Sequence, residues 1–317
     1  MGQFTRRRFL ADSALLAASA AALGFARSPA PSPPEPHLSF PTAPRERLAV
    51  ASYPFRKFID SPFNLGRDHT EPGMDLEGFA AMVVKRFNVR GIELLNNHFA
   101  STDAAYLSQL RNAFEKAGVH VVNIPVDIHH SLYDPDAAKR QTAMDEAQKW
   151  VGVAVAVGSP SVRIHIEGVR GLAPDVGRAA ESLRQVASYG AEKNIVVNLE
   201  NDDLVSEDAF FVVKVIDAVN SPYLRALPDF CNSMLAGMPE FNYDALTLMF
   251  KHAYNISHMK DSEAGDSGKV YTIDVARTFA IAKAANYDGY FSMEWDRPGD
   301  PYKGTERLIE ESLKHLA

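Results

Sequence analysis

Residues 194–203 read Asn-Ile-Val-Val-Asn-Leu-Glu-Asn-Asp-Asp, an apolar run that turns polar within a few residues. With the two-residue period of a β-strand, Asn198 and Glu200 share one face, and Val197 and Leu199 share the other. A carboxylate on the core side of an apolar strand is costly unless a metal ion or a substrate pairs with it. A glutamate in an ordinary loop after a strand would give the same local pattern. The recurrence of this pattern along the chain favours the functional interpretation.

Short apolar runs of this kind occur eight times after residue 45, separated by segments with helical periodicity. The candidate strands are residues 48–55, 90–96, 119–127, 161–167, 195–200, 225–229, 254–260 and 287–295. Asp75 and the Asp134-Pro135 pair are typical of helix starts. Eight strand–helix units predict an α/β fold, a single (β/α)8 TIM barrel. A doubly wound sheet also alternates strands and helices, but no Gly-rich phosphate loop follows the first strand.

In such a barrel the helices cover one face of each strand, and the other face points inward. The expected outward residues are apolar and include Ile92, Leu94, Val122, Ile124 and Val126. The expected inward residues include Glu93, Asn123, Arg163, His165 and Asn198. Branched aliphatic residues usually fill a barrel interior. A polar interior toward the carboxyl ends of the strands therefore predicts an active site at that end.

Four strand ends carry side chains that suit a hard metal ion, namely Glu200, Asp229, His258 and Glu294. Three carboxylates and one imidazole favour a divalent ion such as Mn²⁺, Mg²⁺, Co²⁺ or Zn²⁺ over a thiolate-bound metal. Each strand contributes one ligand, so the fold rather than a local motif would set the spacing of the site.

The order of these motifs along the chain resembles the xylose-isomerase-like TIM barrel superfamily of sugar phosphate isomerases and epimerases. The motifs are Asn-Leu-Glu-Asn, Leu-Pro-Asp-Phe-Cys-Asn, His-Met-Lys-Asp and Ser-Met-Glu-Trp-Asp. The resemblance covers residue 48 to the C-terminus and implies that Glu200, Asp229, His258 and Glu294 are the metal ligands. Asn232 stands where many relatives have a second histidine that contacts the substrate, which leaves the substrate class open.

A metal ion between two glutamates can polarise a carbonyl and its neighbouring hydroxyl, and the glutamates can move the proton next to that carbonyl. We therefore expect Glu200 and Glu294 to be catalytic in a sugar isomerase or epimerase that acts through an enediolate. Lys260 could stabilise the developing oxyanion, or it could form a salt bridge with Asp261 or Glu294. The predicted substrate-binding residues are Glu93, His165 and Asn232.

Three other functions use the same scaffold. An enolate with a leaving group beta to the carbonyl would eject it, giving a lyase or dehydratase on keto-sugars or 3-keto-glycosides. A non-catalytic sugar-binding barrel is the alternative from another class, and the intact set of four ligands favours the enzyme. A DNA repair endonuclease is not expected, because the additional ligands of a trinuclear zinc site are missing and the net charge is −7. We expect no nucleic-acid partner.

The first 26 residues have the composition of an export signal. Arg6-Arg7-Arg8-Phe9-Leu10 precedes an alanine- and leucine-rich run that ends in small residues. The paired arginines resemble a twin-arginine signal, which implies the twin-arginine export machinery as a partner and a periplasmic or secreted protein. The single cysteine, Cys231, is far from the cleavage region, so we expect no stable membrane anchor. The predicted organisation is a signal at residues 1–26, a proline-rich linker at 27–46 and a barrel at 47–317.

Overall fold

Eight parallel strands follow one another around a barrel in the order in which they occur in the chain. The computed structural model describes residues 34–265 and 267–317. The barrel strands are β1 (Leu48–Ala51), β2 (Gly91–Glu93), β3 (His120–Val126), β4 (Ser161–Ile164), β5 (Val196–Glu200), β6 (Leu224–Leu227), β7 (Ile256–Met259) and β10 (Tyr290–Met293). Each lies inside one of the eight predicted segments or extends one residue beyond it. The predicted (β/α)8 barrel is confirmed.

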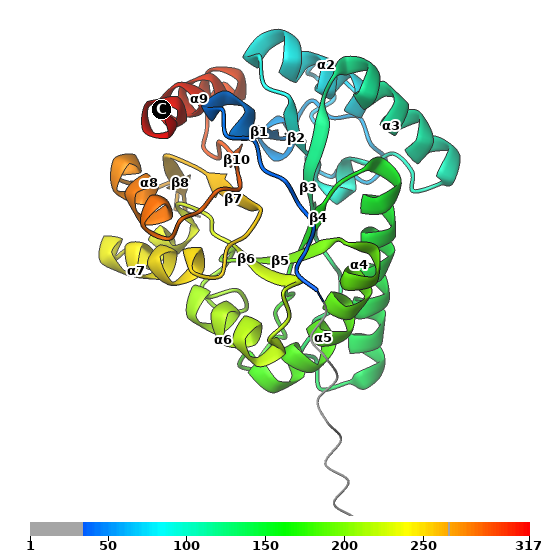
Figure 1. Cartoon of the computed structure of the whole chain (residues 1–317), viewed down its shortest axis with the longest axis vertical. Helices are drawn as coiled ribbons and strands as arrows, with labels where there is room; N and C mark the ends of the chain where they lie inside the picture. Colours follow the sequence, from blue (N-terminus) through cyan, green and yellow to red (C-terminus); the bar gives the residue numbers. More distant parts are fainter. Residues whose placement is uncertain (1–33, 266) are drawn as a thin grey trace, which may run out of the picture. The chain divides into compact units, whose positions relative to one another are not determined.

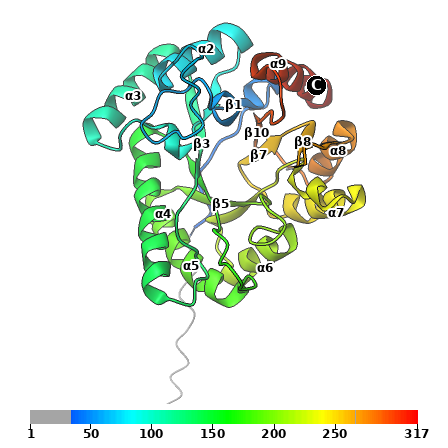
Figure 2. The ribbon, with the colours of Figure 1, turned by 180° about the vertical axis from the view of Figure 1, so that it is seen from behind.

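Eight α-helices surround these strands, and they follow each other in colour order around the ring in Figures 1 and 2. They are α2 (Leu76–Phe87), α3 (Ala104–Ala117), α4 (Ala137–Val157), α5 (Val176–Lys193), α6 (Ala209–Val219), α7 (Pro239–Phe250), α8 (Val275–Ala284) and α9 (Pro301–Leu316). Short 3₁₀ turns are η1 (Pro44–Arg47), η2 (Tyr53–Phe55), η3 (Asn96–His98) and η4 (Asn232–Ala236). Within the described part of the chain, no helix is both long and apolar enough to cross a membrane.

Aspartate side chains begin most of these helices, because a carboxylate accepts hydrogen bonds from the free backbone N–H groups of the first turn. Asp75 accepts from Gly78 N at the start of α2. The predicted start of α4 at Asp134 and Pro135 is two residues early. Asp136 is the N-cap and accepts from Ala138 N, while Asp134 accepts from Asp136 N.

Helix α9 packs closely on the strand end that precedes it. Trp295 follows β10, and a Cβ atom placed on Gly304 of α9 would lie 2.4 Å from the indole ring. Only glycine leaves room for this contact between the helix and the aromatic ring. The contact fixes the last helix next to a strand end that carries Glu294.

The seam between β6 and β7 is the least regular part of the barrel. Isolated bridges join Ala226 to Ala253 and Asp229 to His258, whereas the other neighbouring strands form continuous parallel pairs. Pro228 accepts a hydrogen bond from His258 N (3.1 Å) but has no N–H to donate to β7. The proline therefore interrupts the ladder at the point where the barrel closes.

A change of register between β2 and β3 alters which residues of β3 point inward. Ile92 pairs with Val121, but Glu93 pairs with Asn123, so Val122 is an extra residue in the strand. Val122 packs with Ala49, Leu227 and Ile256 in a small cluster apart from the main hydrophobic core. The prediction that Val122 faces the helices is therefore wrong, whereas Ile124 and Val126 belong to the main core as expected.

An antiparallel hairpin, β8 (Ser262–Ala264) and β9 (Val270–Thr272), follows β7 and was not predicted. Its strands have three residues each and lack the apolar run by which the barrel strands were found. Glu263 of β8 forms an isolated bridge with Asp296, which follows β10. The hairpin thus brings a carboxylate to the end of the barrel where the predicted site lies.

The predicted linker is in contact with the barrel where the structure describes it. Phe40 packs edge-to-face on Tyr254 with ring centroids 5.4 Å apart, and the Tyr254 hydroxyl donates to Pro36 O (3.0 Å). Glu35 pairs with Arg225 at 2.8 Å. These residues are therefore not a fully solvated spacer. The predicted export signal and residues 27–33 lie outside the described residues.

Candidate active site and metal centre

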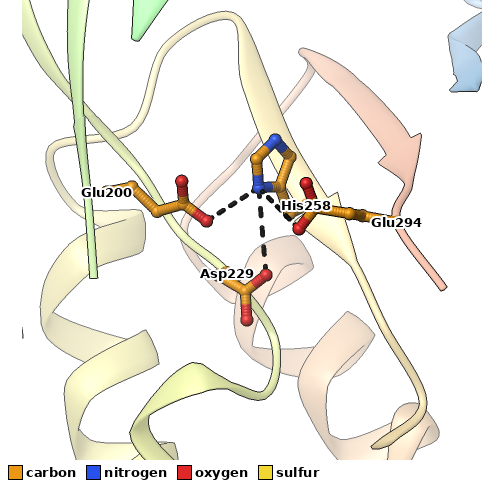
Figure 3. A group of neighbouring side chains, drawn as sticks. All are labelled: Glu200, Asp229, His258 and Glu294. Carbon is orange, nitrogen blue, oxygen red and sulfur yellow. Dashed lines mark hydrogen bonds and ion pairs between the residues drawn. The ribbon is translucent and has the colours of Figure 1, made fainter. Parts of the chain in front are cut away.

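Four side chains from consecutive strand ends meet at one point of the barrel (Figure 3). Glu200 ends β5, Asp229 follows β6, His258 lies in β7 and Glu294 follows β10. One potential ligand atom from each lies within 4.8 Å of all the others. His258 Nδ1 is 2.7 Å from Glu200 Oε1, 3.3 Å from Glu294 Oε2 and 3.9 Å from Asp229 Oδ2. The structure thus brings together the four residues that the sequence predicted as ligands.

The chemistry of this cluster fits a divalent cation. Burial and the neighbouring carboxylates raise the pKa of Asp229 and of Glu294 to about 7, although the positive charges of Lys260 and His258 lower it. Asp229 Oδ2 is buried and has no hydrogen-bond partner among the described residues. Crowded, buried carboxylate oxygens are stabilised by a metal ion, and three oxygens with one nitrogen suit Mg²⁺, Mn²⁺, Co²⁺ or Zn²⁺.

Glu93 lies behind His258, at the far end of its imidazole from the other acidic residues of the cluster. It is fully buried, and both of its oxygens lie 3.1 Å from His258 Nε2. Asn123 donates to Oε1 (2.8 Å) and Ser292 donates to Oε2 (2.6 Å). With both oxygens engaged by protein groups, Glu93 orients the imidazole and leaves Nδ1 for a metal ion, as carboxylates behind metal-bound histidines do. These contacts indicate that Glu93 positions His258, and because Glu93 also lines the site cavity, its role in substrate binding stays a prediction.

Lys260 joins several of the acidic side chains. Its Nζ lies 3.1 Å from Glu294 Oε2, 3.4 Å from Asp229 Oδ2 and 3.0 Å from Glu263 Oε2. Burial lowers the pKa of Lys260, but these carboxylates outweigh burial and raise it well above its usual range. The lysine is therefore a fixed positive charge beside Glu294. The alternative pair with Asp261 is not formed, because Asp261 pairs with Arg307 at 2.6 Å.

Glu200 has its own cation and amide neighbours. Arg163 Nε lies 2.9 Å from Glu200 Oε2, on the side away from His258. The Asn232 amide nitrogen is 3.4 Å from Glu200 Oε1, and Asn232 Oδ1 accepts from Lys260 Nζ at 2.9 Å. Asn232 thus links the surroundings of Glu200 to those of Glu294.

His165 forms a second charged group on the wall of the site. Its Nδ1 lies 2.6 Å from Glu207 Oε2 and 3.5 Å from Asp202 Oδ2. Glu207 is fully buried and accepts from Ile166 N at 2.7 Å. Burial lowers the pKa of His165, but the two carboxylates outweigh it and raise the value to about 11. The imidazole is therefore a positively charged donor at neutral pH.

A cavity of about 490 Å³ opens beside these groups. Its lining includes six of the predicted site residues, namely Glu93, His165, Glu200, Asn232, Lys260 and Glu294. Asp229 and His258 are fully buried next to Glu200 and Glu294. The predicted site residues therefore surround one volume that can hold a small polar molecule.

Several cavity residues were missed by the sequence reasoning. They are Tyr53, Arg163, Asp202 and Glu263, and the sequence reasoning also missed Glu207, which lies behind His165. The strand alternation already placed Arg163 inside the barrel, so its inward position was a usable signal. Glu207 lies in a stretch that reads only as a helix start, and Glu263 comes from the hairpin. Nothing in the local sequence distinguishes those two from surface carboxylates.

Comparisons with solved structures found proteins with a similar fold. Among solved structures, a D-allulose 3-epimerase from Methylomonas sp. has a TM-score of 0.63 at 13% identity, covering 86% of this chain and 98% of that one. A xylose isomerase-like TIM barrel protein from Mycobacterium smegmatis in complex with magnesium has a TM-score of 0.61 at 16% identity, covering 85% of this chain and 97% of that one. A 3-keto-D-glucoside 4-epimerase from E. coli has a TM-score of 0.55 at 17% identity, covering 73% of this chain and 91% of that one. At these identities the likeness shows the shared fold.

The comparison with curated proteins found no match. A family model described as "Xylose isomerase-like TIM barrel" matches residues 82–317, well over half of the 317-residue sequence. The chain therefore belongs to the xylose isomerase-like TIM barrel family.

Proposed function

We propose that this protein is a metal-dependent isomerase or epimerase that removes the proton next to the carbonyl group of a carbohydrate. The pair Glu200 and Glu294 carries the proposal, because their oxygens lie on either side of His258 Nδ1 and both residues line the cavity. A divalent ion bound by these three residues and Asp229 would polarise the carbonyl and its neighbouring hydroxyl.

Glu294 is placed to accept the proton. Its Oε2 faces Lys260 and His258, while Oε1 forms no hydrogen bond or ion pair with the described residues. When a carboxylate oxygen takes the proton from carbon, the C–H electron pair moves toward the carbonyl and gives an enediolate. The resulting carboxylic acid can return the proton to the former carbonyl carbon while the neighbouring hydroxyl proton moves to the oxygen on that carbon, which gives an isomer. If Glu200 enters the step protonated, it can instead deliver its proton to the opposite face of the carbon that lost the proton, which gives an epimer and leaves the first proton on Glu294.

Three fixed cations limit the charge that builds up during this step. Lys260 lies beside Glu294, Arg163 lies beside Glu200, and His165 stands on the cavity wall with Glu207 behind it. Cations that are already in place stabilise a developing oxyanion without having to reorganise. His165 and Asn232 also offer donors to substrate hydroxyls.

The activities by which two of the similar structures are named support this reaction class. The two epimerases are described as acting at carbon 3 of a ketose and at carbon 4 of a 3-keto-glucoside, and both carbons adjoin a carbonyl. The magnesium in the Mycobacterium smegmatis protein supports a divalent ion here. The four ligand residues of this chain provide the groups that such an ion needs.

We also propose that the protein is exported by the twin-arginine route and works outside the cytoplasm. The arginines at positions 6–8 and the apolar run after them support this proposal. An exported enzyme meets free sugars, oxidised sugars and glycosides, whereas sugar phosphates are largely cytoplasmic. The substrate we expect is therefore an unphosphorylated carbohydrate.

The test is proton exchange in deuterated water. The metal-loaded protein is incubated with a panel of ketoses, aldoses and 3-keto-glycosides, and proton NMR follows each C–H signal next to the carbonyl. Loss of one signal, with formation of an isomer or epimer, is the expected result. An unsaturated product would instead show a lyase. Sugar binding without any exchange would identify a non-catalytic binding barrel and overturn the proposal.

A further inference from the structure

A second cavity of about 670 Å³ adjoins the site cavity at the same end of the barrel. The two cavities share three lining residues, Tyr53, Leu95 and Asp127. The rest of the second cavity, called the groove below, is formed by the loop after β1, the η3 region, the loop after β3 and the middle of α4. A ligand that is longer than one sugar ring could therefore extend from the metal site into the groove past Tyr53.

The groove has an apolar wall that is open to solvent. Phe63 is 60% exposed and Leu65 is 98% exposed, and both lie in the loop after β1. On the other side, Trp150 of α4 lines the groove and packs edge-to-face on Phe99, with ring centroids 5.4 Å apart. Exposed apolar side chains beside an active site provide a surface on which a ring can pack, because sugar and aryl rings both have apolar faces.

The groove also contains an unsatisfied hydrogen-bond donor. His98 lines the groove and is 1% exposed. Its Nδ1 lies 2.8 Å from the Ser52 hydroxyl, which accepts a hydrogen bond from Leu95 N and has no other acceptor among the described residues, so we assign the hydroxyl hydrogen to Nδ1. The hydrogen of the neutral ring is then on Nε2. Burial lowers the pKa of His98 to about 3, which keeps the ring neutral.

Nothing in the described part of the chain accepts this hydrogen. His98 Nε2 and the neighbouring Asn97 Oδ1 are both buried atoms without a hydrogen-bond partner. Buried polar atoms that stay unpaired destabilise a folded protein. A ligand hydroxyl group can accept from His98 Nε2 and donate to Asn97 Oδ1.

The charges of the groove indicate a neutral ligand. Arg56 is paired with Asp296 at 3.1 Å and lies over the Tyr53 ring at 4.2 Å, at the boundary between the two cavities. Asp127 pairs with Arg163 at 3.2 Å and Glu146 pairs with His129 at 3.0 Å, while Lys149 forms no ion pair with the described residues. No free cluster of cations is available among the described groove residues for a phosphate or a carboxylate.

We infer that the groove binds a second, hydroxyl-bearing ring, so that the substrate is a glycoside whose reacting sugar lies at the metal site. The assignment of the reacting ring rests on the proposed function, whereas binding in the groove does not. Phe63, Leu65 and Trp150 pack on the second ring, and its hydroxyl pairs with His98 and Asn97. Tyr53 lies next to the bond that joins the two rings.

The inference is tested by binding to the full, metal-loaded chain with Glu294→Gln, which prevents turnover. The ligands are sets of gluco-, galacto-, manno- and xylo-configured methyl glycosides, phenyl glycosides, 4-hydroxyphenyl glycosides and disaccharides. Calorimetry should show, in at least one set, about tenfold tighter binding of a hydroxyl-bearing two-ring ligand than of the methyl glycoside. Equal binding of one-ring and two-ring ligands in every set would overturn the inference.

Variants of groove residues identify which side chains give the tighter binding of two-ring ligands. Phe63→Ala and Leu65→Ala should each weaken two-ring binding about 3- to 10-fold and leave binding of the methyl glycoside unchanged. Val155→Ala, at an exposed position on α4 outside the groove, is the matched control and should change neither. Equal losses for the groove variants and the control would contradict the assigned surface.

His98 has a matched pair of substitutions. His98→Asn keeps a group near Nδ1 for Ser52 but removes the Nε2 donor, whereas His98→Gln places an amide donor near Nε2. The asparagine variant should bind hydroxyphenyl and phenyl glycosides equally, and the glutamine variant should retain the preference for the hydroxyl. No preference for the hydroxyl in the starting protein would refute the role of His98. Two-ring binding without proton exchange would reject the proposed function but not the groove.

Discussion

Both oxygens of Glu93 lie 3.1 Å from Nε2 of His258, at the end of the imidazole opposite Glu200, Asp229 and Glu294. A carboxylate in this position fixes the tautomer of a metal-binding histidine and raises its basicity. Glu93→Ala should therefore lower metal affinity about 10- to 100-fold, with activity recovered at high metal concentration. Ser292→Ala, which removes only a hydrogen bond to Glu93, is the milder control. Metal titration of the three proteins measures the effect, and an unchanged dissociation constant for Glu93→Ala would contradict the assigned role.

The four cluster residues should separate into two functional pairs. Asp229→Asn and His258→Asn should weaken metal binding and regain part of their activity in excess metal. Glu200→Gln and Glu294→Gln keep the side-chain shape but remove a base, and loss of general acid–base catalysis typically costs about 10²–10⁴ in rate. Excess metal should not restore these two. Wild-type proton exchange by both fully metallated Gln variants would show that the glutamates are not the bases.

The ion pair between His165 and Glu207 predicts a loss of stability in alkaline solution. The pKa of His165 is about 11 in the folded protein and near 6.5 when unfolded, so its contribution is complete below pH 6.5 and declines toward pH 11. Between pH 6.5 and 8.5, the free energy of unfolding of the wild type should fall by roughly 1–3 kcal/mol more than that of the variant His165→Gln/Glu207→Gln.

Urea unfolding of both proteins at several pH values measures this difference. The double variant is the control because neither replacement titrates. Burial raises the pKa of Glu207 to about 7. This shift also lowers the free energy of unfolding as the pH rises, because ionisation of a buried carboxyl favours the unfolded state. If the free energy of unfolding changes with pH in the same way in both proteins, the pair is not charged in the folded state.

Two glycines in helices should respond to alanine in opposite directions. A Cβ on Gly304 would lie 2.4 Å from the Trp295 ring, so Gly304→Ala should destabilise the protein by about 1–3 kcal/mol. A Cβ on Gly152 of α4 would meet nothing within 4 Å, so Gly152→Ala should stabilise by about 0.5–1 kcal/mol through its better helix propensity. Thermal unfolding of the two variants measures both effects, and equal changes in Tm would contradict the packing at Trp295.

The export proposal depends on the arginines at positions 6–8. Replacing all three by lysine keeps the charge but should leave unprocessed precursor in the cytoplasm, because the twin-arginine route requires arginine. Cell fractionation of the wild type and the variant, with detection by antibody, shows the distribution. Normal processing of the lysine variant would point to the general secretion route instead.

The barrel could be predicted because its period is repeated eight times, and each repeat supports the others. The ligand set followed from polar residues at the ends of apolar strands, and the structure places Glu200 and His258 2.7 Å apart although they are 58 residues apart in the chain. Such contacts follow once the strand order is known, since the carboxyl ends of parallel strands meet at one end of a barrel.

The remaining details depend on geometry that local sequence does not contain. The inward position of Val122 results from a change of register between two strands, and strand alternation alone assumes that no such change occurs. Glu93 has the sequence pattern of a cavity residue, but only the position of His258 shows that its oxygens are occupied. Glu207 comes from a loop and Glu263 from the β8–β9 hairpin, and the packed barrel rather than their own residues sets the path of both segments.

The interrupted seam between β6 and β7 gives the metal site a second consequence. Asp229 and His258 lie on opposite sides of this seam, and an isolated bridge joins them. An ion bound to both would act as a cross-link where the backbone ladder is weakest. Its binding free energy would then add to the closure of the barrel by thermodynamic linkage. Substitutions that tune ion affinity for catalysis would at the same time change how readily the barrel opens between these two strands.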